Sequence, residues 1–409
     1  MAATYSHDYA DAALTNISAM GFTSVRTWLF TGWGGTVMNS DNEIIGLTGD
    51  FLNNLTDYLS LIREKGLAAN LVLVPHIVQD VPGEIANQSA AMHTVVDAQA
   101  TQAYIDNALM PTLNVIKNYQ DCVIALDLYC EPEGDAEDTA GSDAQNYPGR
   151  TSQLSDLTPF IKAQSDAVKS VIPDMHCLVS SSYNQNYQGF TTYADYGIDI
   201  LGLNIYNDSS DVSVQDNRID SDISAEFSDR WIGECNYKSS KDVVAGWTEK
   251  QFSDVVRNFY ENAKARGYSA CYMWHYSASY NQKTSLVEWQ ENDINEPDLS
   301  KLRLSAQLLH YDIIDYNNDI GKTSGNDSPA LLINHDNTCL RWLGSRQASY
   351  YQLEYNDGND WQLLARIDHV EDQNLYEYVL SAEYAVGNYP LRIVSYTDNS
   401  DTQVSKTIY

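Results

Sequence analysis

The stretch that decides the fold is Cys122–Gly134, which reads CVIALDLYCEPEG. Its first half is an apolar run, and such a run predicts a strand buried on both faces, as in a parallel sheet covered by helices. Its second half places two glutamates, Glu131 and Glu133, directly after that strand. One carboxylate in this place is explained by a cap or a solvated loop, whereas carboxylates on two matching strand ends can form a catalytic pair.

Similar apolar runs recur on both sides of this stretch and alternate with amphipathic stretches of helical period. The expected strands are Ser24–Phe30, Ala68–His76, Cys122–Tyr129, His176–Tyr183, Ile198–Tyr206, Arg230–Tyr237 and Ala270–Ser277. This alternation predicts the α/β class and, over residues 1–320, a (β/α)8 TIM barrel. Because such a barrel needs eight strands, we expect either a short first strand at Ala2–Ser6 or a first strand that the chain lacks.

The pattern changes after the polar linker Asp319–Pro329, where short alternating runs are separated by turn residues. Residues 328–409 are therefore predicted to form a small all-β, immunoglobulin-like sandwich of about seven strands. The runs Trp342–Ile367 and Tyr389–Thr397 resemble a fibronectin type III domain, with Trp342 as the core indole. We assign no chemistry to this domain, and a carbohydrate-binding role beside that of a spacer rests on analogy alone.

The composition limits the classes of partner. There are 56 acidic against 24 basic residues, and the formal charge of -32 repels nucleic acid and anionic membranes. No stretch approaches the roughly 20 apolar residues of a membrane span, and the opening MAATYSHDYADAAL lacks the features of a signal peptide. Six cysteines without a CxxC pair favour buried reduced thiols over a zinc site or a disulfide framework. We expect a monomer without cofactor or metal.

A second glutamate, Glu234, ends the apolar run RWIGECNY and matches Glu131 in position. If Ser24–Phe30 is the second strand, Glu131 ends the fourth and Glu234 the seventh, at the rim where barrel enzymes keep their reactive groups. Two facing carboxylates at that rim suit a retaining glycosidase, in which one protonates the leaving oxygen and the other attacks the anomeric carbon. Glu133 lies further along, and we expect it to be a residue of an acidic loop.

Five residues in a fixed order carry a resemblance to glycoside hydrolase clan A, and within it family 5, over about the first 315 residues. They are Arg26 on the second strand, Glu131 after the fourth, Tyr206 on the sixth, Glu234 after the seventh and Trp274 on the eighth. The resemblance implies that Glu131 is the acid/base, Glu234 the nucleophile and Trp274 a platform under the sugar. It also implies a plant-type β-glycan substrate, β-1,4-mannan or β-1,4-glucan, and an extracellular or cell-surface location.

The residue types are consistent with these roles. Arg26 and Tyr206 can bind the carboxylate of Glu234, and we expect Arg26 to lower its pKa. For Glu131 we expect partial burial and the charge of Glu234 to raise the pKa, so that its acid form survives near neutral pH. His76, at the end of the third strand, either contacts sugar hydroxyls or is a structural histidine.

The chain departs from the family at Cys130, where the family has an asparagine that binds the sugar 2-hydroxyl. A thiol donates and accepts weakly, so another group, Asn204 or Asn236, would have to take over that contact. Cys235 follows Glu234 as Cys130 precedes Glu131. Because side chains alternate along a strand, we expect both thiols to turn away from the glutamates, which argues against a disulfide between them.

Two hypotheses of different class remain beside the glycosidase. The first is a non-catalytic barrel that binds glycans, in which Cys130 marks the decay of the site; the presence of both glutamates favours the enzyme. The second is a metal-dependent hydrolase, which the sequence does not support because it has no HExxH motif or His/Asp cluster. The acidic segment 133–143 could at most hold a structural calcium ion.

Overall fold

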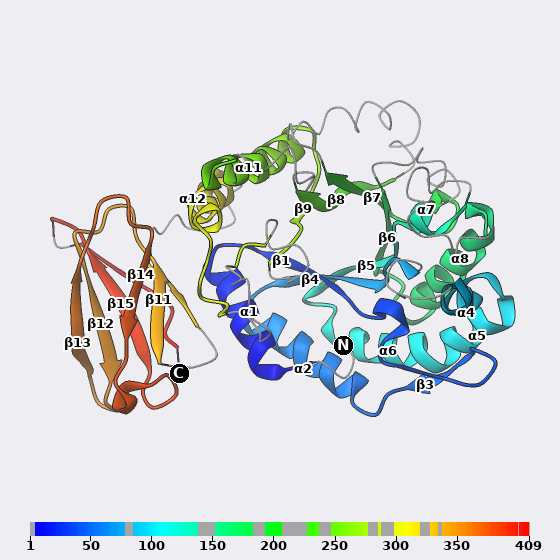
Figure 1. The fold of residues 1–409 in the computed structure, drawn as a ribbon, viewed down its shortest axis with the longest axis horizontal. Helices are drawn as coiled ribbons and strands as arrows, with labels where there is room; N and C mark the ends of the chain where they lie inside the picture. Colours follow the sequence, from blue (N-terminus) through cyan, green and yellow to red (C-terminus); the bar gives the residue numbers. More distant parts are fainter. Residues whose placement is uncertain are drawn as a thin grey trace. The chain divides into compact units, whose positions relative to one another are not determined.

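The computed structural model describes residues 5–77, 85–137, 152–182, 193–206, 227–236, 247–276, 285–287, 298–319, 328–333, 338–399 and 401–408. Its contacts divide the chain into two compact units. One unit contains the parallel sheet, and the other contains most of α1 (His7–Ala19), α12 (Leu304–Asp319) and the C-terminal strands (Figure 1). The domain boundary predicted between residues 320 and 328 stays a prediction.

A parallel sheet forms the centre of the first unit. Its strands follow one another in chain order: β1 (Ser24–Trp28), β4 (Ala68–Val74), β5 (Val123–Cys130), β6 (His176–Ser182), β7 (Ile200–Tyr206), β8 (Asp229–Asn236) and β9 (Ala270–Met273). These are the seven strands expected from the sequence. Of the additional strand expected at Ala2–Ser6, residues 1–4 lie outside the described ranges, and Tyr5 and Ser6 are not in a strand.

The sheet curls into a nearly closed barrel. Arg26 on β1 binds Glu234 on β8, with 2.5 Å between Nη1 and Oε1. In a flat sheet these strands would lie about 24 Å apart, because five steps of about 4.8 Å separate them, and no arginine side chain spans that gap. The strands themselves are apolar on both faces, and Leu71–Val74 of β4 are fully buried. The described strands thus form a seven-stranded, nearly closed parallel barrel, which is consistent with the predicted TIM barrel.

Helices connect the strands. They are α2 (Phe51–Glu64), α4 (Ile85–Val96), α5 (Ala98–Tyr104), α6 (Met110–Ile116), α8 (Leu154–Val171) and α11 (Glu249–Ala265). A π-helical turn, Ile105–Leu109, lies between α5 and α6 just before Pro111, which has no amide hydrogen to donate. No helix in the described ranges is both long and apolar enough to cross a bilayer.

The C-terminal strands form two antiparallel sheets, which confirms the predicted all-β region. One contains β10 (Ala330–Leu332), β11 (Cys339–Leu343) and β14 (Leu375–Val379); the other contains β12 (Tyr350–Asn356), β13 (Trp361–Asp368), β15 (Leu391–Tyr396) and β16 (Thr402–Val404). Trp342 is fully buried in the core that both sheets share, and its ring stacks on Tyr376 at 5.5 Å. The indole is therefore a core residue, as predicted.

Asn16 of α1 joins this region through a fully buried amide. Its Nδ2 donates to the carbonyl of Ile333 at 2.9 Å, and its Oδ1 accepts from the amide of Ile333 at 2.8 Å. The side chain thus pairs with the backbone beyond β10 as a neighbouring strand would. A helix from the start of the chain is in this way fixed to its C-terminal strands.

Candidate active site

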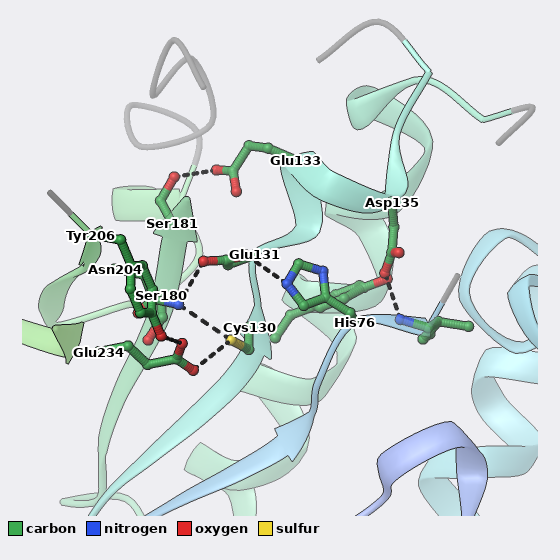
Figure 2. Close-up of polar contacts among 12 residues, drawn as sticks. His76, Cys130, Glu131, Glu133, Asp135, Ser180, Ser181, Asn204, Tyr206 and Glu234 are labelled. Carbon is green, nitrogen blue, oxygen red and sulfur yellow. Dashed lines mark hydrogen bonds and ion pairs between the residues drawn. The ribbon is translucent and has the colours of Figure 1, made fainter. Parts of the chain in front are cut away.

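The barrel brings together the predicted site residues Arg26, His76, Cys130, Glu131, Tyr206 and Glu234 in one network of contacts. Figure 2 shows the part of this network formed by His76, Cys130, Glu131, Tyr206 and Glu234. They come from β1, from the segment after β4, and from β5, β7 and β8. Trp274 is different, because it belongs to the second unit, and its position under a sugar stays a prediction.

A β-bulge in β5 determines the direction in which the side chain of Cys130 points. Asp127 pairs with Leu178 and Cys130 with Ser180, so β5 has one more residue than β6 over this interval. The extra residue shifts the alternation of side chains. Cys130 consequently points into the site, with its Sγ 3.6 Å from Oε1 of Glu234. The expectation that this thiol turns away is wrong for that reason.

A second bulge precedes Glu234. Leu203 pairs with Ile232, and the next residue, Asn204, pairs with Glu234, so Gly233 is the extra residue. A Cβ on Gly233 would lie 2.6 Å from Oγ of Ser180 and 2.8 Å from Oδ1 of Asn204. Only glycine fits so close an approach, and it allows Glu234 to face the barrel interior.

Cys235 lies on the other side of the strand. Its Sγ is 3.5 Å from that of Cys271 on β9, and both thiols are reduced, as is Cys130. The expected absence of a Cys130–Cys235 disulfide is confirmed. The expectation that the thiol turns away therefore holds for Cys235 and fails for Cys130.

Glu234 is held by two donors. Arg26 Nη1 donates to Oε1 at 2.5 Å, and the hydroxyl of Tyr206 donates to Oε2 at 2.6 Å. Arg26 is itself fixed by Asp127, whose Oδ2 accepts from Nη2 at 2.7 Å. The ion pairs are buried, since the side chains of Arg26 and Asp127 are 4% and 0% exposed. A guanidinium between two carboxylates provides a permanent positive charge beside Glu234.

Asp127 was not predicted as a site residue, although an aspartate within an otherwise apolar strand could have indicated one. Ser180 on β6 supports it, because both its hydroxyl and its amide donate to the Asp127 carboxylate. Burial raises the pKa of Asp127, while Arg26 and Ser180 act in the opposite direction. Ser180 thus supports the aspartate that binds the guanidinium of Arg26.

Glu131 occupies a different environment. It lies just beyond β5 in the left-handed region, with φ 55° and ψ 52°, which costs a residue other than glycine roughly 1–2 kcal/mol. Its amide donates to the carbonyl of Ser180 at 2.6 Å. The carboxylate lies 2.5 Å from Nε2 of His76 through Oε2, and its Oε1 accepts from Nδ2 of Asn204 at 2.9 Å. The strained backbone and these two partners set the direction of the carboxyl group.

The expected pKa directions of the two glutamates are reversed. Burial raises the pKa of Glu234, and Arg26 opposes that effect without overcoming it. Burial also acts to raise the pKa of Glu131, but His76 and Asn204 outweigh it and hold that pKa below its ordinary value. The sequence did not place either partner on Glu131, so the prediction lacked the decisive contacts. The two carboxyls interact electrostatically and titrate as a pair.

Cys130 lies between the two glutamates. Its Sγ is 3.5 Å from Nδ2 of Asn204, which also binds Glu131. Burial raises the pKa of the thiol well above its usual range, so the sulfur stays protonated and unreactive. Of the two asparagines considered as substitutes for the family residue, Asn204 donates directly to Glu131.

Glu133 is not the solvated loop residue expected. It lies in the short helix α7 (Pro132–Asp135), is 1% exposed, and accepts from the hydroxyl of Ser181 at 2.5 Å. Asp135 in the same helix is fully buried. The acidic segment is therefore buried from Pro132 to Ala136, whereas Glu137 is exposed. Residues 138–143 lie outside the described ranges, and the calcium expectation with them.

No family model matches the chain. A curated relative, the mannan endo-1,4-beta-mannosidase of Mytilus edulis, is 24% identical over 185 residues, which cover 42% of this chain and 48% of the relative. The match thus spans about half the length of that relative.

Solved structures align over more of the chain. The β-mannanase of Mytilus edulis has a TM-score of 0.50 at 20% identity over 67% of this chain and 81% of its own. The barrel has a mannanase-like fold. A β-1,4-D-mannanase from Cryptopygus antarcticus has a TM-score of 0.51 at 17% identity, over 68% of this chain and 81% of its own. An exo-β-1,4-mannosidase from an Opitutaceae bacterium has a TM-score of 0.54 at 13% identity, over 76% and 56%. At these identities the likeness to the mannanase fold concerns the architecture alone.

Proposed function

We propose that the protein is a retaining β-glycoside hydrolase that cleaves a β-1,4-mannan. The observation that carries this proposal is the pair of glutamates at the barrel rim, the partly buried Glu131 and the buried Glu234, linked through Cys130 and Asn204. Paired carboxylates with different partners are what the double-displacement reaction requires. The likeness of the barrel to mannanases supports mannan over glucan as the substrate.

In the first step, Glu234 attacks the anomeric carbon while Glu131 gives its proton to the departing glycosidic oxygen. The bond to that oxygen breaks, and a glycosyl ester forms on Glu234. Arg26 and Tyr206 hold the nucleophile in place and stabilise its negative charge before the attack. Glu131 must therefore be protonated when the sugar binds.

In the second step, Glu131 removes a proton from water, which attacks the ester and releases the sugar with its original configuration. The ester is neutral, so the repulsion between the two carboxylates is gone and the ionised form of Glu131 is favoured. His76 and Asn204 already favour that ionised form in the free protein. Their contacts suit the base role of Glu131 in this step.

The remaining parts of the proposal rest on the sequence resemblance. Trp274 serves as the platform under the sugar in the cleaved subsite, and His76 contacts its hydroxyls in addition to Glu131. The chain works outside the cell or at its surface as a monomer, with a catalytic domain at residues 1–320 and a fibronectin type III-like domain at residues 328–409.

The test is incubation with β-mannan, β-glucan, xylan and aryl β-glycosides, with the anomeric configuration of the products followed by NMR. Release of β-configured mannosyl products, lost in Glu234→Gln, is the expected result. Binding of a polymer without cleavage would instead support a glycan-binding barrel, for which the presence of Cys130 in place of the family asparagine is the one favourable observation.

A further inference from the structure

A buried aspartate outside the glutamate pair binds the segment that carries His76. Asp135, the last residue of α7, is fully buried. Its Oδ2 accepts from the amide of Ile77 at 2.8 Å and from the hydroxyl of Tyr129 at 2.8 Å. Because Ile77 follows His76 directly, this carboxylate fixes the segment after β4 to the helix that follows Glu131.

The ring of His76 has little room to move. A Cβ on Gly134 would lie 2.9 Å from Cε1 and 3.1 Å from Nδ1 of His76, so the imidazole packs against the backbone of α7. The amide of Gly134 donates to the carbonyl of Glu131 at 2.9 Å, which ties the same turn to the acid/base residue. The imidazole thus lies between α7 and the carboxyl group of Glu131 (Figure 2).

We propose that Asp135 is a positioning residue that sets the acid/base behaviour of Glu131 by holding His76 against it. The catalytic part of this proposal rests on the proposed glycosidase function. The positioning of His76 by Asp135 rests only on the contacts of Asp135. Asp135 contacts neither Glu131 nor His76 through the hydrogen bonds described above. Its effect passes through the backbone at Ile77 and through Tyr129.

Other groups act electrostatically on Glu131 and are not among the described partners of Asp135. They are Arg26 from β1, Cys130 from β5, Tyr206 from β7 and Glu234 from β8. The helix α7 carries two more buried carboxyl groups, Glu133 and Asp135. His76 is the neighbour that most strongly lowers the pKa of Glu131. A displaced His76 would therefore leave Glu131 protonated to higher pH.

The experiment compares Asp135→Ala with Asp135→Asn and with the control Glu133→Gln. The asparagine keeps an acceptor for Ile77 and Tyr129, and Glu133 is a buried carboxylate of the same helix whose described partner is Ser181 instead. The carboxyl carbon of Glu131 is followed by NMR in protein with labelled glutamate, assigned by its loss in Glu131→Gln. The pH profile of kcat/KM on β-mannan is the second readout.

We expect Asp135→Ala to raise the titration midpoint of Glu131 by about half a pH unit or more, with the pH profile displaced in the same direction. Asp135→Asn should restore most of the original midpoint, and Glu133→Gln should leave it unchanged. If Asp135→Ala does not fold, Tyr129→Phe and Gly134→Ala must show the same displacement. A midpoint of Glu131 identical to wild type in the folded variants overturns the proposal, and the carboxyl readout remains valid even if no glycan is cleaved.

Discussion

The two glutamates of the candidate site, Glu234 and Glu131, have basic partners of different chemical kinds. Glu234 lies beside Arg26, whose charge is permanent, and Arg26 rests on the buried Asp127. Glu131 lies beside the imidazole of His76, and the segment that carries His76 is bound by the buried Asp135. Each glutamate thus has a basic partner, and each partner depends on an aspartate from the chain segment 127–135.

The difference teaches how one barrel can give two carboxylates unlike tasks. A nucleophile has to stay ionised through the first step, and a guanidinium that never loses its proton serves that need. An acid/base has to exchange a proton in each step, and an imidazole, unlike a guanidinium, carries no permanent charge beside it. Changes on the two sides of the site should therefore have different effects.

The largest effect is expected when either glutamate loses its charge. Glu234→Gln should lower kcat on β-mannan on the order of 10⁴-fold or more, because no covalent intermediate can form. Glu131→Gln should cost about 10²–10⁴-fold on mannan but far less in the first step on aryl glycosides, whose leaving group needs no proton. Burst kinetics with an aryl mannoside separate the two. Equal loss in both variants on the aryl substrate would remove the assigned difference in roles.

Arg26→Met comes next, because it leaves Asp127 and Glu234 buried without their cation. Removing one partner of a buried pair costs about 3–5 kcal/mol of unfolding free energy, which urea denaturation measures. The double variant Arg26→Met with Asp127→Asn is the control and should recover part of that loss. An unchanged midpoint in the single variant would show that the ion pairs contribute no net stability.

His76→Gln should have a smaller and pH-dependent effect. His76 lowers the pKa of Glu131, so its loss raises that pKa, and the bell-shaped profile of kcat/KM should move to higher pH. His76→Asn, which also lacks the imidazole, should move the profile in the same direction. A profile that stays in place in both variants would contradict the assigned effect of His76 on Glu131.

The smallest effect is expected for Cys130, whose sulfur lies between Glu131 and Glu234. Cys130→Ala removes contacts of 3.5 and 3.6 Å that a neutral thiol makes weakly. We expect kcat/KM on mannan to change by less than about 5-fold, with the pH profile in place. Asn204→Ala is the matched comparison, since it removes the amide from Glu131 itself and should shift the profile. A large loss in Cys130→Ala would make the thiol part of the catalytic machinery.

Much of the fold could be predicted from the sequence. The spacing of apolar residues indicates the strands and helices, and their order along the chain indicates the barrel. The runs around Val123–Cys130 and Asp229–Asn236 could only be buried strands, and successive βα units place their ends at one rim. The approach of Glu131 and Glu234 to one site followed from the same reasoning. The two β-bulges could not be predicted in this way, because a one-residue shift in strand pairing depends on the neighbouring strand and does not change the apolar pattern of the sequence.

The sequence by itself therefore determined the barrel, the all-β region after it and the choice of Glu131 and Glu234 as the candidate pair. Only the tertiary structure decided which way Cys130 points, that Glu133 is buried, and that His76 and Asn204 bind Glu131 while Arg26 and Tyr206 bind Glu234. The physical reason is that the pKa of a buried carboxyl depends on contacts between strands far apart in the chain. Such contacts exist only after the sheet has curled.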